Sequence, residues 1–446
     1  MRRMILATAV ALTTIGALPS ASAQSNTFTV DCNRGQKIAT ALEQGDFRKP
    51  VVINLRGTCR EFVTITRAGV TLRGDPAAEI VAPDNARDLL TISADRATLE
   101  NLTLTGGLTG LSQDHQPSFY AQNVVVQDTS GIGVRVRVGD ARLNGFTVQR
   151  SGGVGVYVVR GGSLIMGALN LGNGQLLHSQ VLASGGAGLS ARSNSVVNLN
   201  GVTVMGSKAQ GVLLSENSQG TISNVTTGSG EIIPSTISDN TLNGVELLSD
   251  SQATVSGSDI SSNGGAGVYM ERSEVEITRS SIEHNGKNPS ANARSGVAGS
   301  MSRVSIGYST IADHPQFGVG LNVGSSLNLD SSSVTGSGQD GVSLYLGVNA
   351  NLNNSKISGN AANGLAMLGS TAQLSAGAEI LNNGYSGVML MTAAKLWLIS
   401  APVTVGGNDR YGVYCHDAES SVADLAFVTF WPANEWEDVS PGCTGF

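Results

Sequence analysis

The chain has few aromatic and few charged residues. Of its 446 residues, 4% are Phe, Trp or Tyr and 14% are Asp, Glu, Lys or Arg. So little Glu and Lys argues against a helical protein, because exposed helix faces are rich in both. The formal net charge of −7 makes nucleic acid and anionic membrane surfaces poor partners. No Asp-Asp pair, Asp-x-Asp motif or metal-binding pair of histidines occurs, so we expect no metal site and no cofactor.

Long apolar runs are also absent, apart from one at the N-terminus. Arg2 and Arg3 precede an apolar run from Met4 to Leu18, and Ala21-Ser22-Ala23 supplies small residues for cleavage. This order predicts a signal peptide over residues 1–23 and a secreted or periplasmic protein. No other segment approaches the roughly 20 apolar residues that a membrane-spanning helix needs.

Cysteine occurs only four times, and only near the two ends of the chain. Sequence alone allows three pairings of Cys32, Cys59, Cys415 and Cys443, and proximity favours Cys32–Cys59 and Cys415–Cys443. Export favours disulfides over metal ligation. We therefore predict an N-terminal cap over residues 24–60 with a short helix, capped at Asp31–Asn33 and extending to about Gln44, and a C-terminal cap over residues 415–446.

Glycine, in contrast, is abundant, with 57 residues, and it recurs at a fixed spacing. Gly318, Gly341, Gly364 and Gly387 lie 23 residues apart, and each is followed by Val or Leu. An aliphatic residue stands seven positions before each glycine and a small polar residue four positions before it. Such a fixed period predicts a solenoid that occupies residues 61–414 as a single domain.

The same glycine position can be followed toward the N-terminus, mostly in steps of 22 or 23 residues. The earlier members of this column are Gly110, Gly133, Gly155, Gly188, Gly211, Gly244, Gly267 and Gly296, and Gly412 follows at the end. The polar residues four positions before the glycine include Asn240, Asn263, Asn292 and His314. Longer steps predict loops near Leu169–Leu176, Val225–Pro234 and Lys287–Arg294.

Each repeat is too short for a helix and has the pattern of three short strands. Residues one and three positions after the glycine should point inward, and residues two and four positions after it should point outward. Val and Ile stand where a leucine-rich repeat would require Leu. The sequence therefore predicts an all-β parallel β-helix with three short strands in each coil of 22–23 residues.

Several segments resemble the pectin-lyase-like right-handed parallel β-helix superfamily. They are Arg56-Gly57-Thr58-Cys59, the run Gly69 to Gly74, the run Glu100 to Gly107, and the Gly-Val coils with Asn at their turns. This resemblance covers nearly all of the mature chain and implies a right-handed helix. The superfamily contains lyases, hydrolases, epimerases and adhesins, so the resemblance specifies fold far more closely than activity.

The outward positions of the early coils provide the candidate site. Neighbouring strands should bring Asp114, Arg135, Arg137 and Tyr157 onto one patch, where arginines beside an aromatic ring suit carboxylated sugars. Arg135, Arg137, Tyr157 and the candidate general base His115 are therefore the catalytic candidates. The candidate ligand-binding residues on the same face are Asp114, Arg192, Glu246, Tyr269 and Glu271. The simpler alternative is a solvated face with Asp–Arg pairs.

Two further features bear on function. The loops predicted above would wall the groove over this face. Later coils place Tyr345, Ala366, Leu368, Met389 and Met391 outward, an apolar strip to be covered by the C-terminal cap or by a partner.

Three functions follow from these observations. The first is a monomeric, non-catalytic scaffold that contacts a polysaccharide or another cell-envelope component. The second is a lyase acting on uronate polymers, for which Ca²⁺ would be the one plausible cofactor. The third is an adhesin that uses the apolar strip.

Overall fold

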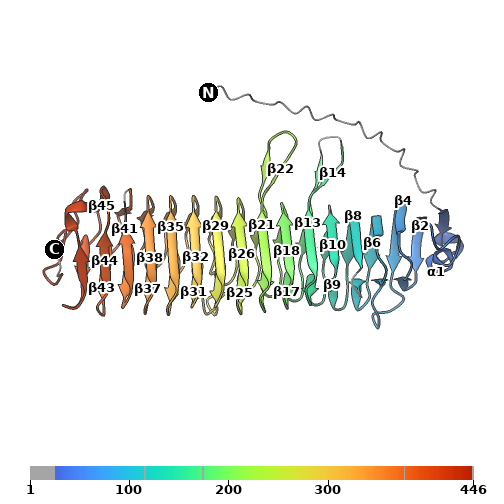
Figure 1. Cartoon of the computed structure of the whole chain (residues 1–446), viewed down its shortest axis with the longest axis horizontal. Coiled ribbons are helices and arrows are strands. Elements are labelled where there is room, and N and C mark those ends of the chain that lie inside the picture. Colours follow the sequence, from blue (N-terminus) through green and yellow to red (C-terminus); the bar gives the residue numbers. More distant parts are fainter. Residues whose placement is uncertain (1–25, 115–116, 173–174, 376, 444–446) are drawn as a thin grey trace, which may run out of the picture.

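The chain winds into a parallel β-helix whose coils stack along one axis (Figure 1). The computed structural model describes residues 26–114, 117–172, 175–375 and 377–443; the predicted signal peptide and His115 lie outside them. Within the described residues, nearly all strands belong to a 15-stranded and a 29-stranded parallel sheet. The predicted all-β parallel β-helix is confirmed.

The 15-stranded sheet takes one strand from each coil. In order its strands are β3 (Val63–Ile65), β5 (Leu90–Ile92), β7 (Thr109–Gln113), β9 (Ile132–Arg137), β12 (Val156–Val159), β17 (Leu189–Arg192), β20 (Val212–Leu214), β25 (Val245–Leu248), β28 (Val268–Glu271), β31 (Val297–Ser300), β34 (Val319–Asn322), β37 (Val342–Tyr345), β40 (Leu365–Leu368), β43 (Val388–Met391) and β46 (Val413–Cys415).

The 29-stranded sheet begins with β1 and four longer strands that each cover two sides of a coil, and it continues with two short strands per coil. The first strand is β1 (Asn26–Asp31), and the long strands are β2 (Val51–Arg60), β4 (Val70–Val81), β6 (Ala97–Thr105) and β8 (Ser118–Gln127). The short strands are β10 (Asp140–Asn144), β11 (Thr147–Gln149), β13 (Ser163–Gly167), β16 (Gln180–Leu182), β18 (Val196–Asn200), β19 (Thr203–Met205), β21 (Gln219–Ser223), β24 (Thr236–Ser238), β26 (Gln252–Ser256), β27 (Asp259–Ser261), β29 (Glu274–Thr278), β30 (Ser281–Glu283), β32 (Arg303–Gly307), β33 (Thr310–Ala312), β35 (Ser326–Asp330), β36 (Ser333–Thr335), β38 (Asn349–Asn353), β39 (Lys356–Ser358), β41 (Thr371–Leu374), β42 (Glu379–Leu381), β44 (Lys395–Leu398), β45 (Val403–Gly406), β47 (Ser421–Ala423) and β48 (Val428–Thr429).

The repeated glycine is required by a close approach between coils. In β37, Val342 and Leu344 point into the core, whereas Tyr345 is 48% exposed. Gly341 lies just before this strand, and a Cβ there would stand 2.5 Å from Ile357 Cγ2 and 2.6 Å from Asn360 Nδ2. No larger residue fits at that distance. The aliphatic and polar residues of each repeat therefore pack directly against the glycine of the neighbouring coil.

The polar residues form a buried ladder along the axis. Asn240 Nδ2 donates to Asn263 Oδ1 over 2.9 Å, and Asn263 Nδ2 donates to Asn285 Oδ1 over 2.9 Å. His314 Nδ1 accepts from the backbone N–H of Asn285 over 3.2 Å and so continues the ladder. The sequence assignment of Asn292 to this ladder was wrong. The extra residues of that coil lie after the ladder position, which moves Asn292 out into the loop.

Two antiparallel hairpins project from one side of the rod (Figure 1). They are β14–β15 (Leu169–Asn170 and Leu176–Leu177) and β22–β23 (Val225–Thr226 and Ile232–Ile233). Both extra segments were predicted. The expectation that they wall a groove over the candidate patch was wrong. Each hairpin connects two strands of the 29-stranded sheet, whereas the candidate patch lies on the 15-stranded sheet. Only the loop at 287–294, between β30 and β31, borders that sheet.

Each end of the stack is closed by a disulfide. Cys32 pairs with Cys59, and Cys415 pairs with Cys443. The N-terminal cap has a 3₁₀ turn, η1 (Cys32–Arg34), followed by a short helix, α1 (Ile38–Leu42), in place of one continuous helix, because Gly35 at φ 75° ends the first turn. At the C-terminus, a further 3₁₀ turn, η2 (Leu425–Phe427), lies between β47 and β48. Among the described residues, no helix is long and apolar enough to cross a membrane.

Candidate functional site

The predicted catalytic patch lies on the N-terminal half of the 15-stranded sheet. Arg135 on β9 lies between Ser112 on β7 and Tyr157 on β12, as the repeat predicts. Arg135 Nη2 lies 2.7 Å from Asp88 Oδ2 and 2.8 Å from Ser112 Oγ. Both partners of the ion pair are largely buried, with exposed side-chain fractions of 28% and 18%. Arg135 is therefore held by a carboxylate of its own chain, one that the sequence did not single out.

The other predicted residues of this face form separate groups. Arg137 lies on the same column as Val159 and Arg192, two strands away from Arg192. Asp114 follows β7, and His115 lies outside the described residues, so the proposed general base has no assigned position. Arg137 and Arg192 thus lie in a separate column, two residues further along the strands than Arg135.

A second group lies in the middle of the sheet. Glu246 on β25 is the direct neighbour of Tyr269 on β28, and Glu271 lies on the same strand as Tyr269. Glu246 accepts hydrogen bonds from Gln210 Nε2 over 2.9 Å and from Asn243 Nδ2 over 2.7 Å. Burial, followed by the charges of Glu271 and Glu246, raises the pKa of Tyr269. The phenol therefore stays protonated and is available as a donor.

These two groups do not form one site. Between them, the outward positions of β17 and β20 hold Ser190 and Leu213, which are 1% and 7% exposed. These buried positions interrupt the exposed row of outward side chains. The structure therefore brings Arg135 to Tyr157 and Glu246 to Tyr269, but it does not join the arginines to the acidic group.

A cavity of this face lies at its C-terminal end, where the sequence predicted no catalytic or ligand-binding residue. We call it the aromatic pocket, and its volume is about 380 Å³. It lies over the last strands of the 15-stranded sheet, β40, β43 and β46, and the turns that precede them. Its lining residues are Ala362, Asn363, Tyr385, Ser386, Met389, Arg410, Tyr411, Tyr414 and Trp436.

An arginine lies between two rings of this pocket. Arg410 Cζ is 4.2 Å from the ring centroid of Tyr385 and 5.1 Å from that of Trp436. No ion pair or hydrogen bond of the Arg410 side chain to a described residue occurs. Aromatic rings attract the flat faces of a guanidinium and leave its N–H donors, which lie in the plane, available. Arg410 is thus an oriented cation without a carboxylate partner among the described residues.

Beside Arg410 lies an aromatic platform. The rings of Tyr411 and Tyr414 stack with centroids 5.3 Å apart and an interplanar angle of 16°. Trp436 meets Tyr411 edge-on, with centroids 5.4 Å apart. The chain has only 8 Tyr and 3 Trp residues, and four of these line this one pocket. Such a concentration in a chain with so few aromatic residues makes the pocket the candidate binding site of this face.

The polar wall of the pocket comes from a small hydrogen-bonded ladder. Asp340 Oδ1 accepts from both the backbone N and the side-chain Nδ2 of Asn363, each over 2.9 Å. Asn363 Oδ1 in turn accepts from the backbone N of Ser386 over 3.2 Å. Burial raises the pKa of Asp340, although the hydrogen bonds from Asn363 act to lower it. Asn363 occupies one oxygen of this carboxylate, and Arg410 is the charged side chain that lines the pocket.

The predicted apolar strip contributes to this pocket in part. Met389 lines it beside Trp436 of the C-terminal segment, whereas Ala366 on the adjacent strand is 5% exposed and Tyr345 is 48% exposed. The strip is therefore not a continuous exposed apolar surface. One signal in the sequence pointed here: Tyr385 and Arg410 occupy the same turn position of the last two coils, and Tyr411 and Tyr414 follow Arg410 within four residues.

Comparison with protein families agrees with this architecture. Two overlapping segments, residues 224–375 and 295–424, match the family model described as right handed beta helix region. The chain is a right-handed parallel β-helix. The fold that the pectin-lyase-like resemblance implied is confirmed, and its handedness with it.

A search of the curated proteins finds no match. Among solved structures, the A-module of the mannuronan C-5 epimerase AlgE4 from Azotobacter vinelandii is 13% identical, with a TM-score of 0.40 and coverage of 88% of this chain and 91% of that one. The pectate lyase Pel9A is 12% identical, with a TM-score of 0.30 and coverage of 94% and 81%. A mutant of the periplasmic alginate epimerase AlgG is 10% identical, with a TM-score of 0.30 and coverage of 92% and 84%. At these identities, nothing about activity follows for this chain.

Proposed function

We propose that this chain is a non-catalytic, extracytoplasmic protein that binds an acidic polysaccharide in the aromatic pocket. The observation that carries the proposal is Arg410, which lies between Tyr385 and Trp436 without a carboxylate partner among the described residues. The stacked pair of Tyr411 and Tyr414 lies beside it. The pocket thus offers a cation and an aromatic platform in one cavity.

This combination matches the two chemical features of a uronic acid residue. A pyranose ring has a face of C–H groups that packs on an aromatic ring, and its carboxylate accepts hydrogen bonds from a guanidinium. Arg410 can donate two parallel hydrogen bonds to a carboxylate while Tyr385 and Trp436 cover its faces. The wall formed by Asn363 and Ser386 lies where sugar hydroxyls would be exposed.

The ion pair on the N-terminal half of the sheet supports a role without catalysis. A uronate lyase needs a base that is free to take a proton from the sugar ring. Arg135 is instead bound to Asp88 and Ser112 over 2.7 and 2.8 Å. The alternative, a lyase, would have to use Arg137 with Tyr157 or His115, and Ca²⁺ would be its expected cofactor.

The compartment follows from the covalent chemistry of the caps. Both ends of the stack are closed by disulfides, which persist in oxidising compartments. The predicted signal peptide over residues 1–23 agrees with this. We infer secretion or a periplasmic location, where polysaccharides of the cell envelope are available as partners.

The test is the affinity of the purified chain for alginate and polygalacturonate, measured by titration calorimetry. We expect Arg410→Ala and Tyr411→Ala each to weaken binding tenfold or more, and Arg410→Lys to restore little of it, because an ammonium lacks the planar fork. Arg279→Ala is the matched control, since Arg279 also lies over an aromatic ring, that of Tyr308 at 5.8 Å, but lines no part of the aromatic pocket.

The same samples decide between binding and catalysis. Equal affinity in the Arg410→Ala variant and the unmodified chain would contradict the proposed pocket. If the unmodified protein shortened the polysaccharide and left unsaturated ends, and Arg137→Ala did not, the lyase would replace the proposed binding protein.

A further inference from the structure

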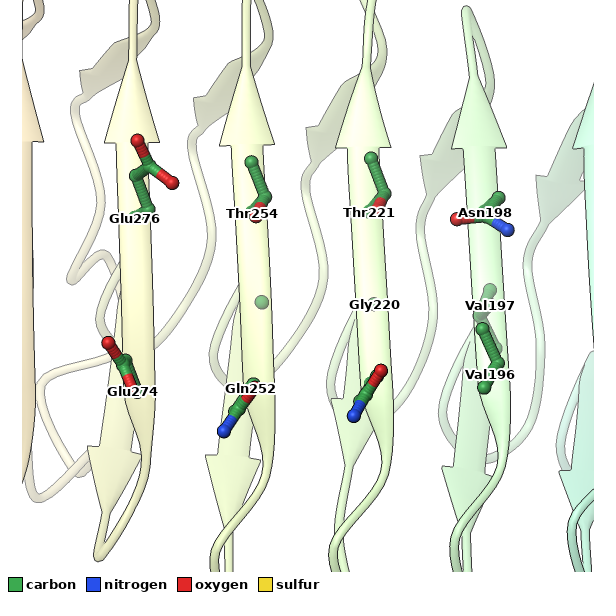
Figure 2. Close-up of a pocket in the computed structure, with 11 residues that line it drawn as sticks. Val196, Val197, Asn198, Gly220, Thr221, Gln252, Thr254, Glu274 and Glu276 are labelled. Atoms are coloured by element: carbon green, nitrogen blue, oxygen red, sulfur yellow. The ribbon is translucent and has the colours of Figure 1, made fainter.

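A second groove lies on the other sheet, on the strands β18, β21, β26 and β29 (Figure 2). Its volume is about 350 Å³. Parallel pairing aligns the four strands residue by residue, so that equivalent side chains form columns across them. We call this feature the amide groove, after the side chains that line it.

Two outward columns form the rims of the amide groove. One rim consists of Val196, Gln219, Gln252 and Glu274. The other consists of Asn198, Thr221, Thr254 and Glu276. Figure 2 shows the labelled members of both rims along the four strands. The rims are thus rich in side chains that both donate and accept hydrogen bonds.

The floor between the rims is apolar and lies at the level of the backbone. Its inward positions are small, with Val197, Gly220 and Ala253 on successive strands. A Cβ at Gly220 would lie 2.6 Å from Leu214 Cδ1, so the tip of Leu214 fills the space that a side chain would occupy. A ring with a C–H face can therefore approach the floor while its hydroxyl groups meet the rims.

The rims have unused hydrogen-bonding capacity. Side chains of Asn198, Gln219 and Gln252 make no hydrogen bond with any described residue, and the same holds for the two threonines. At the far end of these strands, in contrast, Asn200 and Ser223 satisfy each other over 2.8 Å. The difference lies within the same two strands, β18 and β21. The groove therefore exposes donors and acceptors that the fold itself does not use.

The charge of the groove selects against acidic ligands. Glu274 lies 3.8 Å from Arg303 in a weak, exposed ion pair, and no ion pair of Glu276 occurs among the described residues. The lining therefore carries net negative charge and contains no basic side chain. An acidic polysaccharide would be repelled here, whereas the aromatic pocket presents a free cation.

We propose that the amide groove binds an uncharged, hydroxyl-rich polysaccharide that runs along the axis of the β-helix. Strands of a sheet are about 4.8 Å apart, which is close to the advance of one sugar ring in an extended chain. Rings over β21 and β26 would then meet one amide and one hydroxyl each, and a ring over β29 would meet two carboxylates that accept from its hydroxyl groups. A second cavity of about 370 Å³ shares Gln252 and Glu274 with the groove, so the site accommodates several rings. Its lining holds Arg272 and Arg303 beside Asp250 and Glu274, so this extension has no net charge, and the selection against acidic ligands lies in the amide groove itself.

The test is retardation of the purified chain in gels that contain a neutral polymer: dextran, hydroxyethyl cellulose or galactomannan. We expect at least one of these to retard the chain, and the double variant Gln219→Ala with Gln252→Ala to weaken that interaction tenfold or more. The matched control is Asn349→Ala with Asn351→Ala, two exposed amides at equivalent positions of β38, outside the groove. Arg410→Ala should bind the neutral polymer normally.

Three outcomes would overturn the proposal. The first is a lack of retardation by any of the three neutral polymers. The second is equal weakening in the control variant, which would show a general surface effect. The third is a change in sedimentation of the Gln219→Ala, Gln252→Ala variant without a change in retardation, which would make the face a contact between protein chains. Each outcome leaves the acidic site at Arg410 unaffected, because that site is tested separately.

Discussion

At the scale of single residues, His314 is the member of the buried ladder that ionises. It is 1% exposed, accepts from Asn285 N through Nδ1, and has Nε2 3.0 Å from the carbonyl oxygen of Ile282. Burial lowers the pKa of His314 to about 4, although its hydrogen bonds act in the opposite direction. The neutral ring is therefore the form that the folded chain requires.

The first prediction is a pH dependence of stability that His314 causes. Between pH 6.5 and about pH 4 the unfolded chain binds a proton at this residue and the folded chain does not, so the free energy of unfolding falls as pH is lowered through this range. The loss should amount to roughly 3 kcal/mol and should not grow further below pH 4. His314→Asn should remove this part of the slope in urea unfolding, because neighbouring ladder positions already hold Asn.

The exposed His284, with 59% of its side chain accessible, provides the control for this measurement. His284→Asn should leave the slope nearly as it is in the unmodified chain. An unchanged slope in His314→Asn would show that carboxylates, and not this imidazole, set the acid limit of stability.

At the same scale, the candidate site shows what a sequence can and cannot reveal. The position of Arg135 beside Tyr157 could be predicted, because both occupy the same position of consecutive repeats. The ion pair with Asp88 could not, since Asp88 belongs to an irregular segment before the regular coils. Trp436 comes from the segment after the repeat, so its place beside Arg410 depends on how that segment folds back. The repeat predicts which residues are neighbours only for residues that lie within the regular coils.

At the scale of elements, the C-terminal segment both closes the stack and completes the aromatic pocket. Cys415 lies at the end of β46, and its disulfide to Cys443 closes a loop of sequence separation 28 that includes Trp436. The backbone N–H of Trp436 also donates to the carbonyl oxygen of Arg410 over 3.1 Å. The bridge therefore ties the outer wall of the pocket to the last coil.

Removal of this bridge should reduce both stability and acidic-polysaccharide binding. For the pair Cys415→Ser and Cys443→Ser, the chain-entropy estimate gives a loss of about 3–4 kcal/mol as an upper figure, measured by urea unfolding. Affinity for polygalacturonate should fall as well, because Trp436 loses its fixed position. The pair Cys32→Ser and Cys59→Ser removes a loop of nearly equal size, with separation 27, at the other end. If that second pair weakened polygalacturonate binding equally, the effect would be one of global stability and not of the pocket.

The elements also show where prediction of the fold ends. The glycine spacing predicted the strands of the regular coils and their alternation, because both follow from one repeated close approach. Insertions were recognised by length, but length does not say at which turn they leave the coil. The hairpins β14–β15 and β22–β23 leave within the 29-stranded sheet, and the loop at 287–294 leaves after Asn285. The bases of the hairpins pack against glycines such as Gly145 and Gly201, where a Cβ would meet Leu177 and Val225.

At the scale of the whole molecule, the β-helix holds two cavities of different charge on one rod. From β29 to the first coil of the aromatic pocket there are four strand steps, or about 20 Å along the axis. The pocket at the C-terminal end presents Arg410, whereas the amide groove presents Glu276 and uncharged amides. The two grooves lie on different sheets, so a polymer in one does not cover the other.

If both proposals hold, one chain should link two different polysaccharides. We expect beads that carry polygalacturonate to capture a fluorescent neutral polymer only when the protein is present. Arg410→Ala should abolish this capture because the protein no longer binds polygalacturonate. Gln219→Ala with Gln252→Ala should abolish it because the protein no longer binds the neutral polymer. A mixture of these two variants should also fail, because neither molecule has both sites. Capture restored by the mixture would mean that separate chains associate, and the rod would then be one part of a larger assembly and not itself the link.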